Sequence, residues 1–335
     1  MISSNKKILV IGAGSIGRRH IGLFNKFYSL DIADINIKRL RLANKLFKIK
    51  KSYTDYKTAI KNNKYEAVAI CTPPHLHLKI AEFSVKYNNN LFIEKPLGIT
   101  IKGWNKISKI SKKKNLINYV AYCHRFINFF QRARDLIKKN KIGKILHANM
   151  RWGSYLPDWH PWEKYYEFYM AKKNEGGGAL LDESHGIDII RFFLGEVKEV
   201  SAFVDKISDL KITSDDLSML NLKLKKNIYV HVNFDLLARY PRNNFEIIGS
   251  KGTIVLDRVE NKLKIFQAKT KKWKIYSYTQ NDVLKMYNKQ IAHFIDCIKK
   301  RKKTLIDIED AIKTQKVIDA SFKSSRLRKN IKVNI

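Results

Sequence analysis

Three side chains of types that can exchange a proton with a hydroxyl group stand out by their position in this chain of 335 residues. Lys95 stands between Glu94 and Pro96, in a segment that follows a short apolar run, and His185 follows Asp182 by three residues. An ammonium group can hydrogen-bond an alcohol and move a proton when a positive neighbour lowers its pKa, and imidazole titrates near neutrality. We predict that Lys95, His185 and Asp182 are catalytic.

Each of these residues also has an ordinary structural explanation. Lys95 belongs to a lysine-rich chain, in which surface lysines are common. Asp182 could cap a helix while His185 packs in a polar seam. A metal site with His160 as a third ligand is a further alternative, but these residues are scattered along the chain, so we predict that no metal is bound.

A glycine pattern near the start of the chain predicts the cofactor. The apolar run Ile8–Ile11 stops at the first glycine of G-x-G-x-x-G. The three glycines permit a tight turn, close approach of the backbone to a pyrophosphate, and close packing of helix on strand. Free N–H groups at the start of the helix attract phosphate. The cofactor-binding residues predicted here are Gly12, Gly14, Ser15, Ile16 and Gly17.

An acidic residue then favours NAD over NADP. Asp34 lies 22 residues after Gly12, near the spacing of about 20 at which a carboxylate binds the adenosine ribose. Lys38 and Arg39 follow and could hold a 2′-phosphate, so NADP remains open. The alternative is that Asp34 caps the helix that begins at Ile37.

Two further loops follow predicted strands at the edge of the sheet where ligands bind. One is Cys71–His77, which its prolines stiffen, and the other begins with Glu94 after the strand Leu91–Ile93. An ordinary strand-to-helix loop is the alternative for the first. The cofactor-binding residues predicted in these loops are Thr72, Pro73, His77, Glu94 and Lys95.

The elements that position these residues alternate in the first third of the chain, which predicts right-handed crossovers and a doubly wound parallel sheet over residues 1–122. The strand-like runs are Ile8–Ile11, Leu30–Ile35, Ala67–Cys71, Leu91–Ile93 and Leu116–Ala121, and helical patterns such as Ile37–Phe47 and Leu76–Tyr87 lie between them.

Over residues 123–335 the pattern predicts a second, α+β domain with an open, mainly antiparallel sheet. One helix is expected over Ala179–Leu194, ending at Gly195, and the C-terminal helix could pack back on the first domain. The other helical patterns are Ile127–Lys139, Asp282–Lys300 and Ile308–Ser324. The strand-like runs are Ile145–Gly153, Val197–Phe203, Leu217–Leu224, Ile228–Leu236, Asn244–Ile248, Thr253–Leu256 and Lys262–Phe266.

The net charge of +36 is the main oddity of the composition. It indicates either a phosphate-bearing partner or a composition bias, and we favour the bias because the lysines are spread over most helices. We therefore predict no nucleic-acid partner, although the positive field should attract an anionic substrate. The sequence contains no apolar run long enough to span a membrane. The absence of a signal region and three widely spaced cysteines favour the cytoplasm.

Five segments of the sequence resemble motifs of the Gfo/Idh/MocA oxidoreductases, and they occur in the same order as in that family. The matching segments are Gly12–Gly17, Cys71–His77, Glu94–Leu97, Gly176–Asp188 and Gly249–Thr253. The resemblance implies an N-terminal Rossmann domain and a C-terminal open-sheet domain that often forms the oligomer interface. It implies NAD(P)-dependent oxidation or reduction of a sugar, cyclitol or nucleotide sugar, in which Lys95 contacts nicotinamide ribose and substrate and His185 is the acid/base partner.

The resemblance also bears on the substrate. It implies that Tyr122–Phe126 enters the substrate pocket, with Arg125 as its basic residue. Inositol dehydrogenase-like members place the aspartate four residues before the histidine, whereas the spacing here is three. This spacing and the aromatic loop 153–162 resemble a subset associated with surface-glycan and sialic-acid-type sugar pathways.

We expect the aromatic loop to bind the sugar, with packing at a dimer interface as the alternative. Trp159 could stack on a sugar ring, and Arg151 or Arg125 could bind a carboxylate or phosphate. The predicted substrate-binding residues are Arg125, Arg151, Tyr155, Trp159 and His160.

The sequence thus predicts an NAD(P)-dependent oxidoreductase acting on CH–OH groups of a small sugar-type substrate. We expect a homodimer or homotetramer. The alternative is a non-catalytic dinucleotide-binding sensor or regulatory protein.

Overall fold

The computed structural model of the protein describes residues 6–159, 161 and 163–335. The chain forms two compact units. The first contains the described residues up to Tyr122 together with Tyr287–Ile312, and the second contains Cys123–Met286 and Lys313–Ile335. The two later boundaries fall inside the long helices α9 (Gln280–Lys300) and α10 (Ile308–Leu327).

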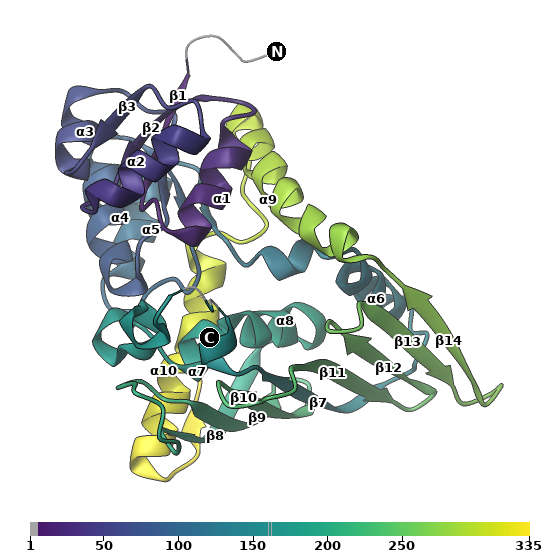
Figure 1. Ribbon diagram of the computed structural model, residues 1–335. Coiled ribbons are helices and arrows are strands. Elements are labelled where there is room, and N and C mark those ends of the chain that lie inside the picture. The colour runs from purple at the N-terminus through teal and green to yellow at the C-terminus, as the bar shows by residue number, and fades with distance from the viewer. Residues whose placement is uncertain (1–5, 160, 162) are drawn as a thin grey trace. The chain divides into compact units, whose positions relative to one another are not determined.

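The first unit is built on a six-stranded parallel sheet in the order β3-β2-β1-β4-β5-β6, of which Figure 1 labels β1, β2 and β3. The order reverses between β1 and β4, and ligands of such sheets bind outside the carboxyl ends of the strands at that reversal. The predicted Rossmann fold is therefore confirmed. Its strands are β1 (Lys7–Ile11), β2 (Ser29–Ala33), β3 (Lys51–Tyr53), β4 (Ala67–Ile70), β5 (Asn90–Ile93) and β6 (Asn118–Val120).

Helices follow most of these strands, and a short 3-10 turn, Pro74–Leu76, precedes α4. Phe92 of β5 packs edge-on against Phe24 and Phe294, with ring centroids 5.4 Å and 5.5 Å away. Because Phe294 comes from α9, the returning segment belongs to the core of this unit. The helices are α1 (Ser15–Phe24), α2 (Ile37–Leu46), α3 (Tyr56–Asn62), α4 (His77–Lys86) and α5 (Trp104–Lys113).

The second unit is built on a nine-stranded sheet in the order β14-β13-β12-β11-β7-β10-β9-β8-β15. Only β7 and β10 pair in parallel among the described strands of this sheet, which confirms an open, mainly antiparallel sheet. The strands are β7 (Ile145–Gly153), β8 (Val197–Asp205), β9 (Leu217–Leu224), β10 (Tyr229–Asp235), β11 (Arg242–Gly249), β12 (Gly252–Asp257), β13 (Lys262–Gln267), β14 (Lys272–Ser277) and β15 (Ile331–Lys332).

Helices cover one face of this sheet. Figure 1 shows α6 (Asn128–Lys138), α7 (Ala179–Asp182) and α8 (Ser184–Leu194) on that face. The residues of β7 alternate accordingly, because Met150 and Trp152 are buried against the helices and Arg151 is exposed on the other face.

The single helix expected over Ala179–Leu194 is two helices. Glu183 has φ −84° and ψ 18°, which takes it out of the α-helical region, and a new helix begins at Ser184. Asp182 and His185 therefore lie on either side of a break. None of the helices in the described part of the chain is both long and apolar enough to cross a membrane.

Candidate active site

The glycine turn after β1 fits a dinucleotide. Gly12 has φ +96°, and a Cβ there would lie 2.5 Å from the carbonyl oxygen of Cys71. A Cβ at Gly17 would lie 1.9 Å from the carbonyl oxygen of Gly12, whereas a Cβ at Gly14 would meet nothing within 4 Å. The fold thus requires two of the glycines, and the third leaves open space where a pyrophosphate can approach the backbone.

The start of α1 supplies donors beside that space. The first N–H groups of a helix have no carbonyl partner within the helix and form a site for an anion. In α1 these belong to Ser15, Ile16 and Gly17, of which Ser15 is exposed and Ile16 is half-buried. The predicted phosphate contacts are therefore reachable from solvent.

The carboxylate of Asp34 is fixed next to the glycine turn. Its Oδ2 accepts a hydrogen bond from the Ala13 N–H at 2.7 Å, and its Oδ1 accepts one from the Asn36 N–H at 2.8 Å. Asn36, not Asp34, caps α2, where its side chain accepts from the N–H groups of Lys38 and Arg39. Each carboxylate oxygen retains a lone pair with which to accept a ribose hydroxyl.

The loop after β5 contains Lys95, and its backbone is fixed by the buried side chain of the preceding residue. Glu94 is buried, and its Oε2 accepts a hydrogen bond from the Lys95 backbone N–H at 3.1 Å. Its Oε1 lies 2.5 Å from Nε2 of His20, a fully buried residue of α1. His20 is not among the residues predicted from the sequence, although its position three residues after Gly17 puts it on the same helix face as that glycine.

In the loop after β4, the residues predicted to bind the cofactor differ in their exposure to solvent. Thr72 and Pro73 are half-buried, whereas the His77 side chain is fully buried and both ring nitrogens lie within hydrogen-bond distance of backbone carbonyls, those of Thr72 and Pro96. His77 can therefore influence a cofactor only through the two loops that it joins.

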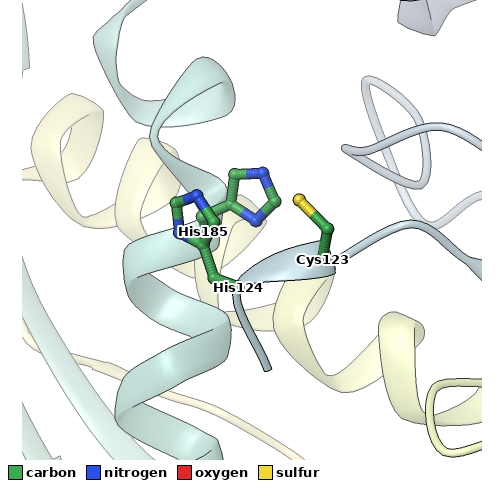
Figure 2. A group of neighbouring side chains, drawn as sticks. All are labelled: Cys123, His124 and His185. Atoms are coloured by element: carbon green, nitrogen blue, oxygen red, sulfur yellow. The ribbon is translucent and has the colours of Figure 1, made fainter. Parts of the chain in front are cut away.

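In the second unit, the predicted acid/base residue belongs to a buried group of three side chains. Figure 2 shows His185 of α8 with Cys123 and His124, which belong to the 3-10 segment Cys123–Phe126. The rings of His124 and His185 stack with centroids 3.9 Å apart and planes 15° apart. The ring of Trp152 lies edge-on to His124 at 5.6 Å.

A buried ion pair joins the two elements that carry these rings. Arg125 Nε and Nη2 donate to the two carboxylate oxygens of Asp188 at 2.8 Å and 2.6 Å, and both side chains are buried. A bidentate pair of this kind fixes orientation as well as distance. It binds the 3-10 segment to α8, so Arg125, predicted to bind substrate, has a carboxylate of its own chain as partner.

The ligand-type atoms of Cys123, His124 and His185 all lie within 4.8 Å of one another, a spacing that could suit a metal ion. An imidazole nitrogen binds a metal in the plane of its ring. Two stacked rings whose planes differ by 15° cannot both point at one ion without turning. The geometry favours a ring stack over a chelate, and the absence of a metal stays a prediction.

The remaining predicted residues are spread over the unit. Asp182 is buried and accepts a hydrogen bond from the Tyr169 hydroxyl at 3.1 Å. In the aromatic loop, Trp159 donates from Nε1 to the Ser154 hydroxyl at 2.7 Å, and the Arg239 guanidinium lies 3.5 Å from the centre of the Tyr155 ring.

The structure does not bring Arg151 to the stacked histidines. It points to the opposite face of the sheet from Trp152, because neighbouring residues of a strand alternate. His160 lies outside the described residues.

Comparisons with known proteins agree with this geometry. Residues 6–122 match an oxidoreductase family with an NAD-binding Rossmann fold, and residues 130–255 match the GFO/IDH/MocA C-terminal domain. The chain is similar to myo-inositol 2-dehydrogenase of Thermotoga maritima, with 25% identity over 264 residues, which cover 76% of this chain and 75% of that protein. It is 24% identical over 210 residues to 2,7-anhydro-N-acetylneuraminate hydratase of Mediterraneibacter gnavus, covering 61% of this chain and 54% of that one.

Among solved structures, a levoglucosan dehydrogenase in complex with NADH and levoglucosan has the same fold. The TM-score is 0.87 at 21% identity, and the alignment covers 99% of this chain and 100% of the other.

Proposed function

Because this chain belongs to the Gfo/Idh/MocA family of NAD-binding oxidoreductases, we propose that it transfers a hydride between NAD and a hydroxyl-bearing carbon of a sugar, cyclitol or nucleotide sugar. The observation that carries the proposal is the placement of Lys95. It is the second residue after β5, whose neighbour β4 pairs with β1, the strand that leads into the glycine turn. An ammonium group and a dinucleotide site therefore share one edge of one sheet.

Bound NAD supplies the hydride acceptor. The chain's own residues then handle the proton. Lys95 hydrogen-bonds the substrate hydroxyl and orients its carbon, and the imidazole of His185 accepts the hydroxyl proton as the C–H hydride leaves and the carbonyl forms. The stack with His124 holds the imidazole in place, and we assign Asp182 the supporting acidic role. In the reverse direction His185 returns the proton.

We further propose an acidic sugar as substrate, of the kind used in surface-glycan metabolism. The net charge of +36 favours attraction of an anion. A relative that acts on an anhydro-sialic acid supports the same class. NAD rather than NADP is favoured because Asp34 would repel a 2′-phosphate.

The test combines identification of the ligand that copurifies with the protein, by mass spectrometry, with a panel of acidic and neutral sugars and cyclitols followed by NADH absorbance. Lys95→Ala and His185→Asn should each lower kcat by about a hundredfold or more, while NADH binding, measured by fluorescence, stays close to that of the wild type. Near-normal turnover in Lys95→Ala would overturn the assignment. Tight NADH binding with no turnover on any compound would support a sensor instead.

A further inference from the structure

The hydrogen-bond surroundings of His77 suit only a doubly protonated ring. Nε2 lies 2.8 Å from the carbonyl oxygen of Thr72, and Nδ1 lies 3.0 Å from the carbonyl oxygen of Pro96. Carbonyl oxygens accept hydrogen bonds and never donate them. A neutral ring would turn one nitrogen lone pair toward a carbonyl oxygen inside a fully buried site, so both nitrogens must carry a proton.

A buried imidazolium needs a negative partner, and Glu94 is that partner. Burial lowers the pKa of His77, and this effect outweighs the Thr72 carbonyl, the charge of Glu94 and the Pro96 and Leu97 backbone groups, which raise it. The second proton is indicated by the hydrogen-bond geometry, because its loss would set a nitrogen lone pair against a carbonyl oxygen. Burial and the same Glu94 charge raise the pKa of the Cys71 thiol well above its usual range, so that thiol stays neutral.

His20 does not take this role, although it touches the same carboxylate. Its ring lies among apolar neighbours, with the Phe92 ring edge-on at 4.8 Å, and its Nδ1 has no hydrogen-bond partner among the described residues. His20 contacts Glu94 through Nε2 but is bonded to neither loop carbonyl, so it does not join the loop after β4 to the loop after β5.

Together these contacts hold the Lys95 segment from two sides. Glu94 accepts from the Lys95 N–H, and His77 binds the carbonyl of Pro96, the next residue. We propose that His77 is a positioning residue for Lys95, a buried imidazolium balanced by Glu94 that fastens the loop after β4 to the loop after β5. The inference rests on the proposed catalytic role of Lys95.

The charge state can be measured without any substrate. In the full-length protein labelled with 15N-histidine, both ring nitrogens of His77, assigned by its loss in His77→Gln, should show protonated shifts with slowly exchanging protons at neutral pH. Glu94→Gln should remove one of these protons near neutrality. An unprotonated nitrogen signal from His77 in the wild type at neutral pH would overturn the proposal.

The positioning role is tested by kinetics. His77→Leu should lower kcat by about ten- to hundredfold while KM and NADH affinity change little, because the Lys95 segment is misplaced and the binding groups remain. His77→Gln, which can still donate to one carbonyl, should recover part of the loss. Lys79→Gln removes an exposed charge from the same helix and should match the wild type.

Equal kcat in the wild type and His77→Leu would reject the positioning role. If Lys95→Ala itself retains turnover, the proposed function fails, while the NMR result on His77 stands independently.

Discussion

The carboxylate of Asp34 stabilises the glycine turn and is already oriented before the cofactor binds. It accepts hydrogen bonds from the N–H groups of Ala13 and Asn36, so the ribose of a bound cofactor would be its third hydrogen-bond partner. Pre-orientation of this kind raises affinity because little freedom is lost on binding.

Asp34→Ala should therefore weaken NADH binding by about ten- to hundredfold, through loss of charge-assisted hydrogen bonds worth about 1.5–3 kcal/mol. NADPH binding should stay the same or improve, because repulsion of the 2′-phosphate is removed. Fluorescence titration with both cofactors measures the change. Asp34→Asn keeps an acceptor for the Ala13 N–H and controls for collapse of the turn, and an unchanged NADH affinity in both variants would contradict the ribose assignment.

At the scale of single residues, the sequence predicts the position of a side chain where the residues next to it along the chain form a recognisable motif. Gly12, Asp34 and Lys95 each follow a recognisable strand, so their place at the sheet edge could be inferred. The partnership of His20 with Glu94 joins residues 74 positions apart and has no local signal. The same holds for the stacking of His124 on His185.

Among the elements, the start of α7 shows how a helix end is stabilised from a distant segment. Asp215 accepts the Leu180 N–H through Oδ2 at 2.9 Å, and the Ala179 N–H through its own carbonyl at 2.9 Å. A Cβ at Gly178 would lie 2.1 Å from the Asp215 carboxylate, which explains the glycine. Burial raises the pKa of Asp215 to about 6, against smaller opposing effects of hydrogen bonds from Leu180 and Ser218.

This raised pKa predicts that stability decreases with pH over a defined range. The folded protein holds the Asp215 proton up to about pH 6, whereas the unfolded chain releases it near its ordinary value of 3.8. The free energy of unfolding should therefore fall between these values, by up to about 3 kcal/mol from this group. Urea unfolding at a series of pH values in wild type and Asp215→Asn checks this. The variant should lack that part of the slope, and identical slopes would contradict the prediction.

The sequence marks the buried strands of the first sheet more clearly than the ends of its elements. Burial on both faces gives those strands continuous hydrophobic runs. The edge strand β3 (Lys51–Tyr53) is exposed to half-buried and carries no such run. The break at Glu183 could not be predicted, because the apolar pattern continues across it.

On the scale of the whole molecule, the long C-terminal helices show what the hydrophobic periodicity of a sequence cannot predict. A helical pattern tells which face is apolar but not which sheet that face covers. Tyr287–Ile312 joins the first unit, where Gln290 accepts from the Tyr119 hydroxyl at 3.2 Å and Thr304 donates to the Asn118 carbonyl at 2.6 Å. These contacts arise between residues more than 170 positions apart, beyond the reach of local reasoning.

The uncovered face of the nine-stranded sheet bears on the oligomeric state. Phe203 and Tyr229 are 67% and 56% exposed on strands β8 and β10, and Met219 lies opposite Phe203 on β9. Trp273 and Ile275 are exposed on β14 at the other end of the sheet. The same face contains a hollow of about 570 Å³ lined in part by polar side chains such as His147 and His231. Exposed aromatic groups gathered on one sheet face are typical of an interface.

We therefore predict that the protein is a homodimer or homotetramer that buries this face. Light scattering coupled to size-exclusion chromatography should give a mass at least twice that of the chain. The double variant Met219→Glu/Tyr229→Glu should shift it toward the monomer, since two new charges per copy would lose their hydration in the interface. Leu46→Glu, at an apolar residue 54% exposed on α2, is the matched control and should leave the mass unchanged. A monomeric wild type, or a double variant that keeps the wild-type mass, would show that this face is not the interface.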